Sequence, residues 1–174
     1  MKNTFGNAGS MTIFGEGHGS AVGAVLDELA AGLPVDEAVI AAAMDRRRAR
    51  GDGLSTARTE ADAVEFLSGV YEGRTTGTAV TLMIRNLNTR SGDYAKTADL
   101  LRPGHADYTA YAKYEGFQDA RGGGHFSGRI TAASVAAGTI CETVLNGLGV
   151  KVYTHIAECA GVQDAPLSSA AGLV

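Results

Sequence analysis

Residues 102–129 bring together side-chain types that suit acid–base chemistry and anion binding. At one end, Arg102-Pro-Gly-His105 predicts a rigid turn that presents an imidazole. At the other end, Arg121-Gly-Gly-Gly-His-Phe-Ser127 predicts a glycine loop at the start of a helix. Catalytic and anion-binding groups commonly sit on loops that a rigid scaffold positions. We therefore expect the functional site here.

Two histidines are the candidates for proton transfer, because imidazole is the side chain whose unperturbed pKa lies nearest neutrality. One is His105, and the other is His18 in the string FGEGHG. The glycines on both sides of His18 leave its ring accessible, which suits a ligand-facing position as well as an ordinary surface turn. The string lacks the third glycine of a dinucleotide-binding loop. With no Ser-His-Asp spacing or cysteine nucleophile motif, covalent catalysis is not indicated.

The glycine loop and a second arginine cluster both suit an anionic ligand. A glycine loop at a helix N-terminus offers backbone N–H groups and a favourable dipole, to which Ser127 adds a hydroxyl and Arg121 and Arg129 add charge. Without the Lys-Ser/Thr ending of a P-loop, nucleotide hydrolysis is disfavoured, and a helix cap with no ligand is the alternative. The cluster Arg46, Arg47, Arg48, Arg50 and Arg58 suits either bidentate anion recognition or a solvated helix end.

Composition sets broad limits on the function. The chain has 174 residues, 45% of them hydrophobic and 20% charged, which fits one globular domain rather than a disordered chain. A net charge of −4 gives no reason to expect nucleic acid or an anionic membrane as a partner. No apolar run is long enough for a membrane span. Cys141 and Cys159 are expected to be buried bystanders in a reduced, cytoplasmic protein.

The elements that position these residues are short strands interspersed with helices, without regular βαβ alternation, so the predicted class is α+β. A helix begins after Asp36, its N-cap. A longer helix starts at Gly128 and ends at Gly147-Leu-Gly149. We also expect strands at 11–14 and 150–156, and a hairpin of 64–71 with 79–84. Residues 20–29 suit a strand or a helix, and Gly23 favours the strand. Residues 54–63 and 86–96 are expected to be polar loops, the second folding over a site. We expect a helix at 107–114, whose Tyr108, Tyr111 and Tyr114 pack in the core, and a frayed tail at 161–174.

Several longer motifs together resemble the chorismate synthase family. They are FGEGHG at 14–19, Asp45-Arg46-Arg47-Arg48, VEFLSGVYEGRTTGTAV at 64–80, RPGHADYTAYAKY at 102–114 and RGGGHFSGRITAASVAAG at 121–138. The resemblance covers residues 4–160 and matches the N-terminal half of the family. It implies a β-α-β sandwich, with helices between antiparallel sheets, that assembles as a homotetramer.

By this resemblance, the family reaction is an anti-1,4-elimination of phosphate from 5-enolpyruvylshikimate 3-phosphate. The product is chorismate, on the shikimate pathway to the aromatic amino acids. The reaction requires reduced FMN, with NADPH as a candidate reductant, in a cytoplasmic flavoprotein. No nucleic acid, membrane or metal is implied.

The resemblance also implies roles for individual residues. His18 matches the histidine that protonates the departing phosphate, and His105 matches the one that acts beside the flavin. His125, Phe126 and Ser127 occupy the flavin-contacting position. Arg47 matches a position for the nicotinamide cofactor or the substrate. The implied substrate pocket comprises Arg47, Arg48, Arg102, Arg121 and Arg129.

The chain departs from the family pattern in three ways. The usual second arginine a few residues after Arg47 falls near Gly53 or Leu54, which leaves open whether Arg50 substitutes for it. Gly17 replaces the serine of the common FGESHG string, which removes a hydroxyl beside His18. Family members are about twice this length, and their C-terminal half supplies much of the flavin site and an aspartate implicated in proton removal. Two hypotheses follow: a chorismate synthase, or the N-terminal part of one, that needs a further half, or a truncated, catalytically silent domain that binds anions or associates with other subunits.

Overall fold

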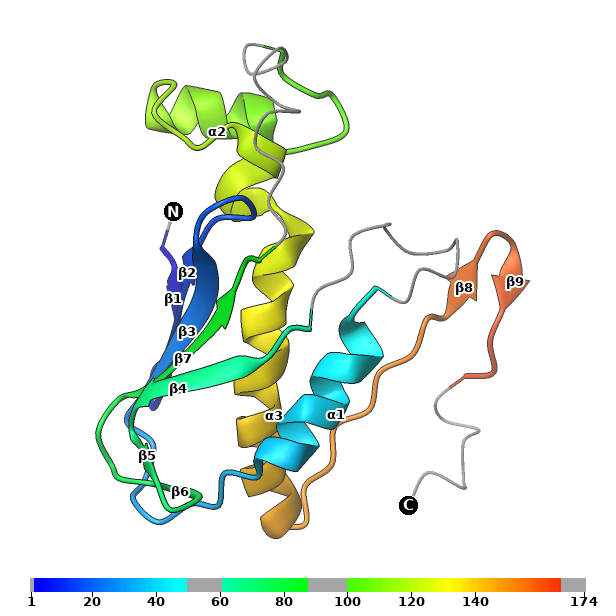
Figure 1. The fold of residues 1–174 in the computed structure, drawn as a ribbon. Coiled ribbons are helices and arrows are strands. Elements are labelled where there is room, and N and C mark those ends of the chain that lie inside the picture. The colour runs from blue at the N-terminus through cyan, green and yellow to red at the C-terminus, as the bar shows by residue number, and fades with distance from the viewer. Residues whose placement is uncertain (1, 50–60, 88–99, 167–174) are drawn as a thin grey trace.

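A five-stranded antiparallel sheet forms one layer of the fold in this computed structural model, which describes residues 2–49, 61–87 and 100–166 (Figure 1). Its strand order is β1-β2-β3-β7-β4. The strands are β1 (Thr4–Phe5), β2 (Ser10–Gly15), β3 (Ala21–Asp27), β4 (Val64–Ser68) and β7 (Val80–Arg85). Every neighbouring pair is antiparallel, so the expected strands at 11–14 and 20–29 and the 64–71/79–84 hairpin are confirmed.

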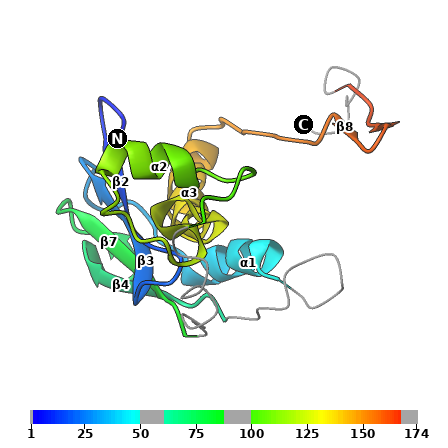
Figure 2. The same cartoon turned by 90° about the horizontal axis from the view of Figure 1, so that it is seen from above.

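Two helices, α1 (Glu37–Arg47) and α3 (Thr131–Gly147), form the second layer (Figures 1 and 2). The Asp36 carboxylate caps α1 by accepting hydrogen bonds from the Ala38 and Val39 N–H groups at 2.9 and 3.2 Å. The face of α3 that packs inward is mostly alanine, which lets this helix approach β3, β7 and α1 closely. None of the helices in the described ranges is long and apolar enough to cross a membrane.

The core lies between the sheet and these helices. Alternate residues of β3 and β7 point toward the helices because side chains alternate between the two faces of a strand. The fully or almost fully buried residues include Val22, Ala24, Leu26, Val80, Leu82 and Ile84 from the sheet, Ile40 and Met44 from α1, and Ala132, Ala133, Ala136, Ala137 and Ile140 from α3. This packing fixes where the ends of β2, β7 and α3 lie.

Smaller elements complete the described chain. Strands β5 (Val70–Tyr71) and β6 (Arg74–Thr75) pair within the loop between β4 and β7. Helix α2 spans Asp107–Tyr114, as expected from the sequence. Strands β8 (Glu158–Cys159) and β9 (Val162–Gln163) pair in an arm that extends away from the two layers (Figure 2). The rest of the expected frayed tail, from residue 167, lies outside the described residues.

Three expectations about local structure are wrong. Residues 150–156 alternate like a strand, yet no strand forms there, because the segment runs along the exposed arm without a sheet edge to pair with. Tyr108 and Tyr111 are 69% and 51% exposed rather than core residues, since α2 buries only Ala110. Cys141 and Cys159 are exposed thiols, not buried ones.

Candidate active site

Both candidate histidines converge on one glycine run. A Cβ atom built on Gly122 would lie 2.3 Å from Cδ2 and 2.6 Å from Nε2 of His18. A Cβ atom built on Gly123, the next residue, would lie 2.4 Å from Cε1 and 2.7 Å from Nε2 of His105. The absence of side chains at these two positions is therefore what lets the imidazoles of two distant segments approach the same stretch of backbone.

The glycine run has a backbone that other residues rarely adopt. Gly122, Gly123 and Gly124 have φ values of +59°, +89° and +54°, within an irregular 3₁₀ turn of Arg121–Phe126. The sequence predicted that the glycine run opens a helix, but the run does not lead directly into α3. A separate 3₁₀ turn at Gly128–Ile130 leads into that helix, and Ser127 caps it by accepting a hydrogen bond from the Arg129 N–H at 3.3 Å. The run shapes the histidine site instead of presenting a helix N-terminus.

His105 is oriented by Asp107 at the start of α2. The Asp107 carboxylate lies 2.8 Å from Nδ1 of His105 and accepts two hydrogen bonds from the Arg102 guanidinium, at 2.7 and 2.9 Å. The Arg102 hydrogen bonds hold the pKa of Asp107 well below its usual range, and the His105 hydrogen bond adds to this effect. An ionised Asp107 can only accept, so Nδ1 of His105 carries the proton and Nε2 faces Gly123.

A similar acid–arginine pair lies near His18. Arg121 donates two hydrogen bonds to the Asp119 carboxylate, at 2.9 and 2.8 Å. These bonds are the main reason that the pKa of Asp119 is lowered, and the charge of His18 lowers it further. His18 itself is half-buried in the loop between β2 and β3, where the Gly19 N–H donates to the Glu16 carbonyl oxygen at 3.0 Å. Each histidine thus lies near one ionised aspartate that is paired with one arginine.

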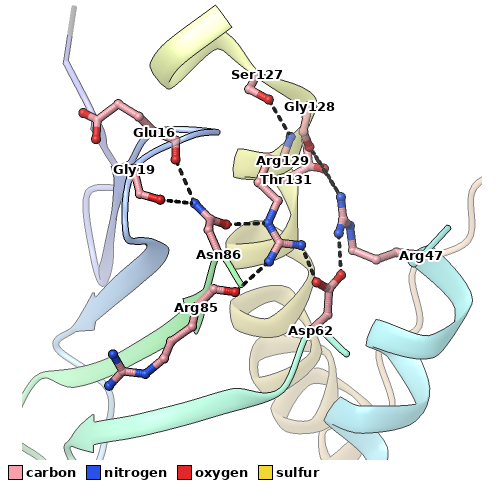
Figure 3. Close-up of polar contacts among 10 residues, drawn as sticks. All are labelled: Glu16, Gly19, Arg47, Asp62, Arg85, Asn86, Ser127, Gly128, Arg129 and Thr131. Atoms are coloured by element: carbon pink, nitrogen blue, oxygen red, sulfur yellow. Dashed lines mark hydrogen bonds and ion pairs between the residues drawn. The ribbon is translucent and has the colours of Figure 1, made fainter. Parts of the chain in front are cut away.

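Two of the arginines assigned to substrate binding share a buried carboxylate (Figure 3). Asp62 has a side chain only 2% exposed, and it pairs with both Arg47, at 2.9 Å, and Arg129. Arg129 also donates to the Asn86 side-chain oxygen at 2.9 Å and to the Arg85 carbonyl oxygen at 3.2 Å. The Asp62 carboxylate balances one of the two guanidinium charges and holds both groups in fixed, largely buried positions, which limits how far these arginines can reach toward a second anion.

The other three predicted arginines make more exposed ion pairs. Arg48 pairs with Asp45 at 2.5 Å, Arg102 with Asp107, and Arg121 with Asp119. Their side chains are 42%, 45% and 48% exposed. Exposed ion pairs contribute little stability, and about half of each of these side chains remains open to solvent. These three arginines are consequently better placed than Arg47 and Arg129 to meet an anion arriving from solvent.

His125 and Phe126 line a cavity of about 730 Å³ beside the glycine run. Its walls include the aromatic residues Phe14, Tyr114 and Phe117 and the polar residues Glu16, Arg102, Gln118 and Asp119. The hydrogen bond between Nδ1 of His125 and the Gly15 carbonyl oxygen, at 2.8 Å, fixes that ring in the wall. Gly123 also lines the cavity, whereas neither His18 nor His105 does. The cavity therefore adjoins the histidine site without containing it.

Ser127, the third residue that the resemblance assigns to the flavin, explains why position 17 is a glycine. A Cβ atom built on Gly17 would lie 2.6 Å from both Cβ and Oγ of Ser127. The Gly17 N–H donates to the Gly124 carbonyl oxygen at 2.9 Å, which holds the loop in this close approach. A serine at position 17 does not fit this arrangement unless Ser127 or the loop moves.

The sequence did not single out four residues that the structure places in the site, Asn86, Asp62, Asp107 and Asp119. Asn86 and Asp62 lie in segments that the sequence predicted only as polar loops. Asn86 directly follows β7 and Asp62 lies two residues before β4, and this closeness to predicted strands is the one signal that could have marked them. Arg50, Arg58 and residues 88–96 of the predicted loop over the site lie outside the described residues. In the ranges that the structure describes, no group of three or more potential metal ligands occurs.

Comparisons with known proteins agree with the resemblance. The family model for chorismate synthase matches residues 10–171. Chorismate synthases of Aliarcobacter butzleri and Aeropyrum pernix are 48% and 49% identical to the chain over 161 and 162 residues. These matches cover 92% and 93% of the chain but only 45% and 42% of the relatives.

A solved structure described as a crystal structure of chorismate synthase shares the fold, with a TM-score of 0.59 and 31% identity. The match covers 83% of this chain and 36% of that one. The chain thus spans less than half the length of the relatives that it matches. With the family model matching nearly the whole chain, this protein belongs to the chorismate synthase family.

Proposed function

We propose that this chain supplies the two-histidine part of a chorismate synthase active site. The reaction is the elimination of phosphate from 5-enolpyruvylshikimate 3-phosphate, in which the C–O bond to phosphate and a C–H bond break and chorismate forms. The convergence of His18 and His105 on Gly122 and Gly123 carries the proposal, because it brings two proton-transfer groups to one place. Family membership supplies the reaction class.

In this proposal His18 protonates the departing phosphate, whose negative charge would favour the imidazolium form. His105 acts on the flavin side of the site. The hydrogen bond from Nδ1 of His105 to Asp107 leaves Nε2 as the atom that exchanges a proton. Arg48, Arg102 and Arg121 meet the anionic groups of the substrate, and Arg47 and Arg129 act mainly by holding Asp62.

The residues present fit the ring system of FMN, the family cofactor. A cavity of about 730 Å³ with Phe14, Tyr114, Phe117 and Phe126 in its walls has the size and apolar character of a site for a planar aromatic group. His125, Phe126 and Gly123 would hold the ring there, near Ser127. When bound, reduced FMN supplies electron density to the breaking C–O bond. The cavity wall also carries the carboxylates of Glu16, Asp107 and Asp119, which do not favour a phosphate, and its Arg102 is paired with Asp107. We therefore assign the FMN phosphate to the C-terminal half of the family fold. NADPH is the proposed reductant.

The complete enzyme is proposed to be a cytoplasmic β-α-β sandwich and a homotetramer. Here the helices cover one face of a single large sheet, so a second sheet would cover their other side. Exposed apolar residues of the arm, of α2 and of the turn after α2, such as Val152, Ile156, Tyr108 and Phe117, would pack against the added parts or other subunits. The second candidate function is a catalytically silent domain that binds anions or associates with other subunits, and the exposed guanidinium groups of Arg48, Arg102 and Arg121 are the observation that supports it.

A chimera distinguishes these two functions. Residues 1–166 joined to the C-terminal half of the Aliarcobacter butzleri relative should release phosphate from 5-enolpyruvylshikimate 3-phosphate with dithionite-reduced FMN. The 174-residue chain alone should release little, and His18→Ala in the chimera should abolish release. A soluble, FMN-binding chimera without turnover would support the silent domain. Rapid turnover by the isolated chain would contradict the need for a second half, and FMN titration of that chain measures how much of the cofactor site it holds.

A further inference from the structure

Asn86 connects the His18 loop to the buried Asp62 ion-pair network. It is half-buried, directly follows β7, and uses both ends of its amide (Figure 3). Its side-chain nitrogen donates to the carbonyl oxygens of Glu16 and Gly19, at 3.1 and 2.9 Å. Its side-chain oxygen accepts from Nε of Arg129 at 2.9 Å. These partners fix the amide orientation, because the reverse would set its oxygen against two carbonyls and its N–H groups against a guanidinium.

The two carbonyl oxygens bracket the candidate acid. Glu16 and Gly19 are the first and last residues of the turn that contains Gly17 and His18. The backbone N–H of Asn86 also donates to the Ser20 carbonyl oxygen at 3.0 Å, so both the side chain and the main chain of Asn86 hold this turn. A two-donor clamp across the ends of a four-residue turn restricts the residue between them more than one bond could.

The far side of the clamp is rigid. Arg129, whose side chain is 10% exposed, is fixed by Asp62, and Asp62 is fixed by Arg47 from the end of α1. Arg47 also lies within 3.4 Å of the Gly128 carbonyl oxygen and the Thr131 hydroxyl, at the start of α3. The clamp therefore fixes the position of the His18 turn relative to α1 and α3 as well as relative to the sheet.

We infer that Asn86 is a positioning residue for His18, and that Arg129, Asp62 and Arg47 act through it rather than by touching the substrate. Asn86 holds the imidazole against Gly122, where the glycine run leaves room for it. Only the predicted effect of Asn86 on turnover rests on the proposed function. The position of His18 can be measured without any substrate.

Two variants test the inference. Asn86→Ala removes all three side-chain hydrogen bonds. Asn86→Asp keeps an oxygen for Arg129 but replaces the donor that faces Glu16 and Gly19. Glu65→Gln is the control, because it breaks an exposed ion pair with the neighbouring Arg85, at 2.7 Å, and leaves the clamp intact.

The closing experiment is NMR of the 174-residue chain. In both Asn86 variants, amide exchange at Gly19 should rise about tenfold or more, and the nuclear Overhauser contact between His18 ring protons and Gly122 should weaken. Exchange in the β2–β3 and β3–β7 ladders should stay within about twofold of wild type, and Glu65→Gln should change neither readout. In the chimera, kcat should fall while KM stays unchanged.

Unchanged Gly19 exchange and an unchanged His18–Gly122 contact in either variant would overturn the inference. Faster amide exchange in the β2–β3 and β3–β7 ladders as well as at Gly19, in both variants, would also overturn the inference, since Asn86 would then support the whole sheet. If the turn loosens as expected but even the wild-type chimera releases no phosphate, the proposed function fails while the positioning role of Asn86 stands.

Discussion

Gly122→Ala tests whether the glycine run is there to accommodate His18. The φ of +59° at Gly122 lies in the left-handed region, where an L side chain costs about 1–2 kcal/mol. The new Cβ would lie 2.3 Å from Cδ2 of His18, whereas carbon atoms in favourable contact are separated by about 3.5 Å or more. The imidazole must therefore move by about 1 Å, or the run must distort by as much.

Gly32→Ala is a matched control. Gly32 has a φ of +83°, and a Cβ built on it would meet no heavy atom within 4 Å. Both variants should lose a similar free energy of unfolding from the backbone, about 1–2 kcal/mol in urea titrations. Only Gly122→Ala should displace His18, so the difference between the two variants isolates the contact with the imidazole.

The assay is phosphate release by the chimera with reduced FMN, alongside the His18 ring signals in NMR spectra of the chain. A displacement of about 1 Å in a catalytic group can reduce the rate about 10²-fold. We expect a loss of that order for Gly122→Ala and little loss for Gly32→Ala. Equal rates in the two variants, or unshifted His18 signals in Gly122→Ala, would refute the reasoning.

Three further predictions concern the charges and the close approach around the site. Asp62→Asn should lower the free energy of unfolding by about 3 kcal/mol, because two arginines lose a buried carboxylate; asparagine tolerates the φ of +51° at this position. The exposed control Asp45→Asn should change the free energy of unfolding by under about 1 kcal/mol. Equal effects of the two substitutions would argue against a buried network. The pKa of Asp107 is lowered in the folded state, so its stabilising effect is complete above the unfolded value of about 4 and is lost as the pH falls below it. The stability difference between wild type and Asp107→Asn should accordingly shrink from pH 7 to pH 3 in urea titrations, and a constant difference would contradict the assignment. Gly17→Ser should lower the melting temperature through its clash with Ser127, and Ser127→Gly should restore much of the loss in the double variant; strict additivity would mean that the two sites do not touch.

Local patterns predicted most of the secondary structure because the forces that set it are local. The Asp36 cap, the small residues of 131–147 and the β-type run at 79–84 each concern neighbours along the chain. The same reasoning failed at 150–156, where the pattern suits a strand but no partner edge is available. It also failed at Tyr108 and Tyr111, because spacing along a helix does not say whether anything packs against that face.

The sequence by itself determined which residue types could do the chemistry. His18 and His105 stood out because glycines and a rigid turn surround them, and the glycine run stood out by its composition. Only the tertiary structure brought both imidazoles to Gly122 and Gly123, and only it assigned partners to the arginines. Asp62 pairs with Arg47 and Arg129 because α1 packs against α3 and the start of β4 reaches the same point. Such pairings join residues far apart in the chain, so no local pattern encodes them, and Asn86 acquires its role only from where β7 ends.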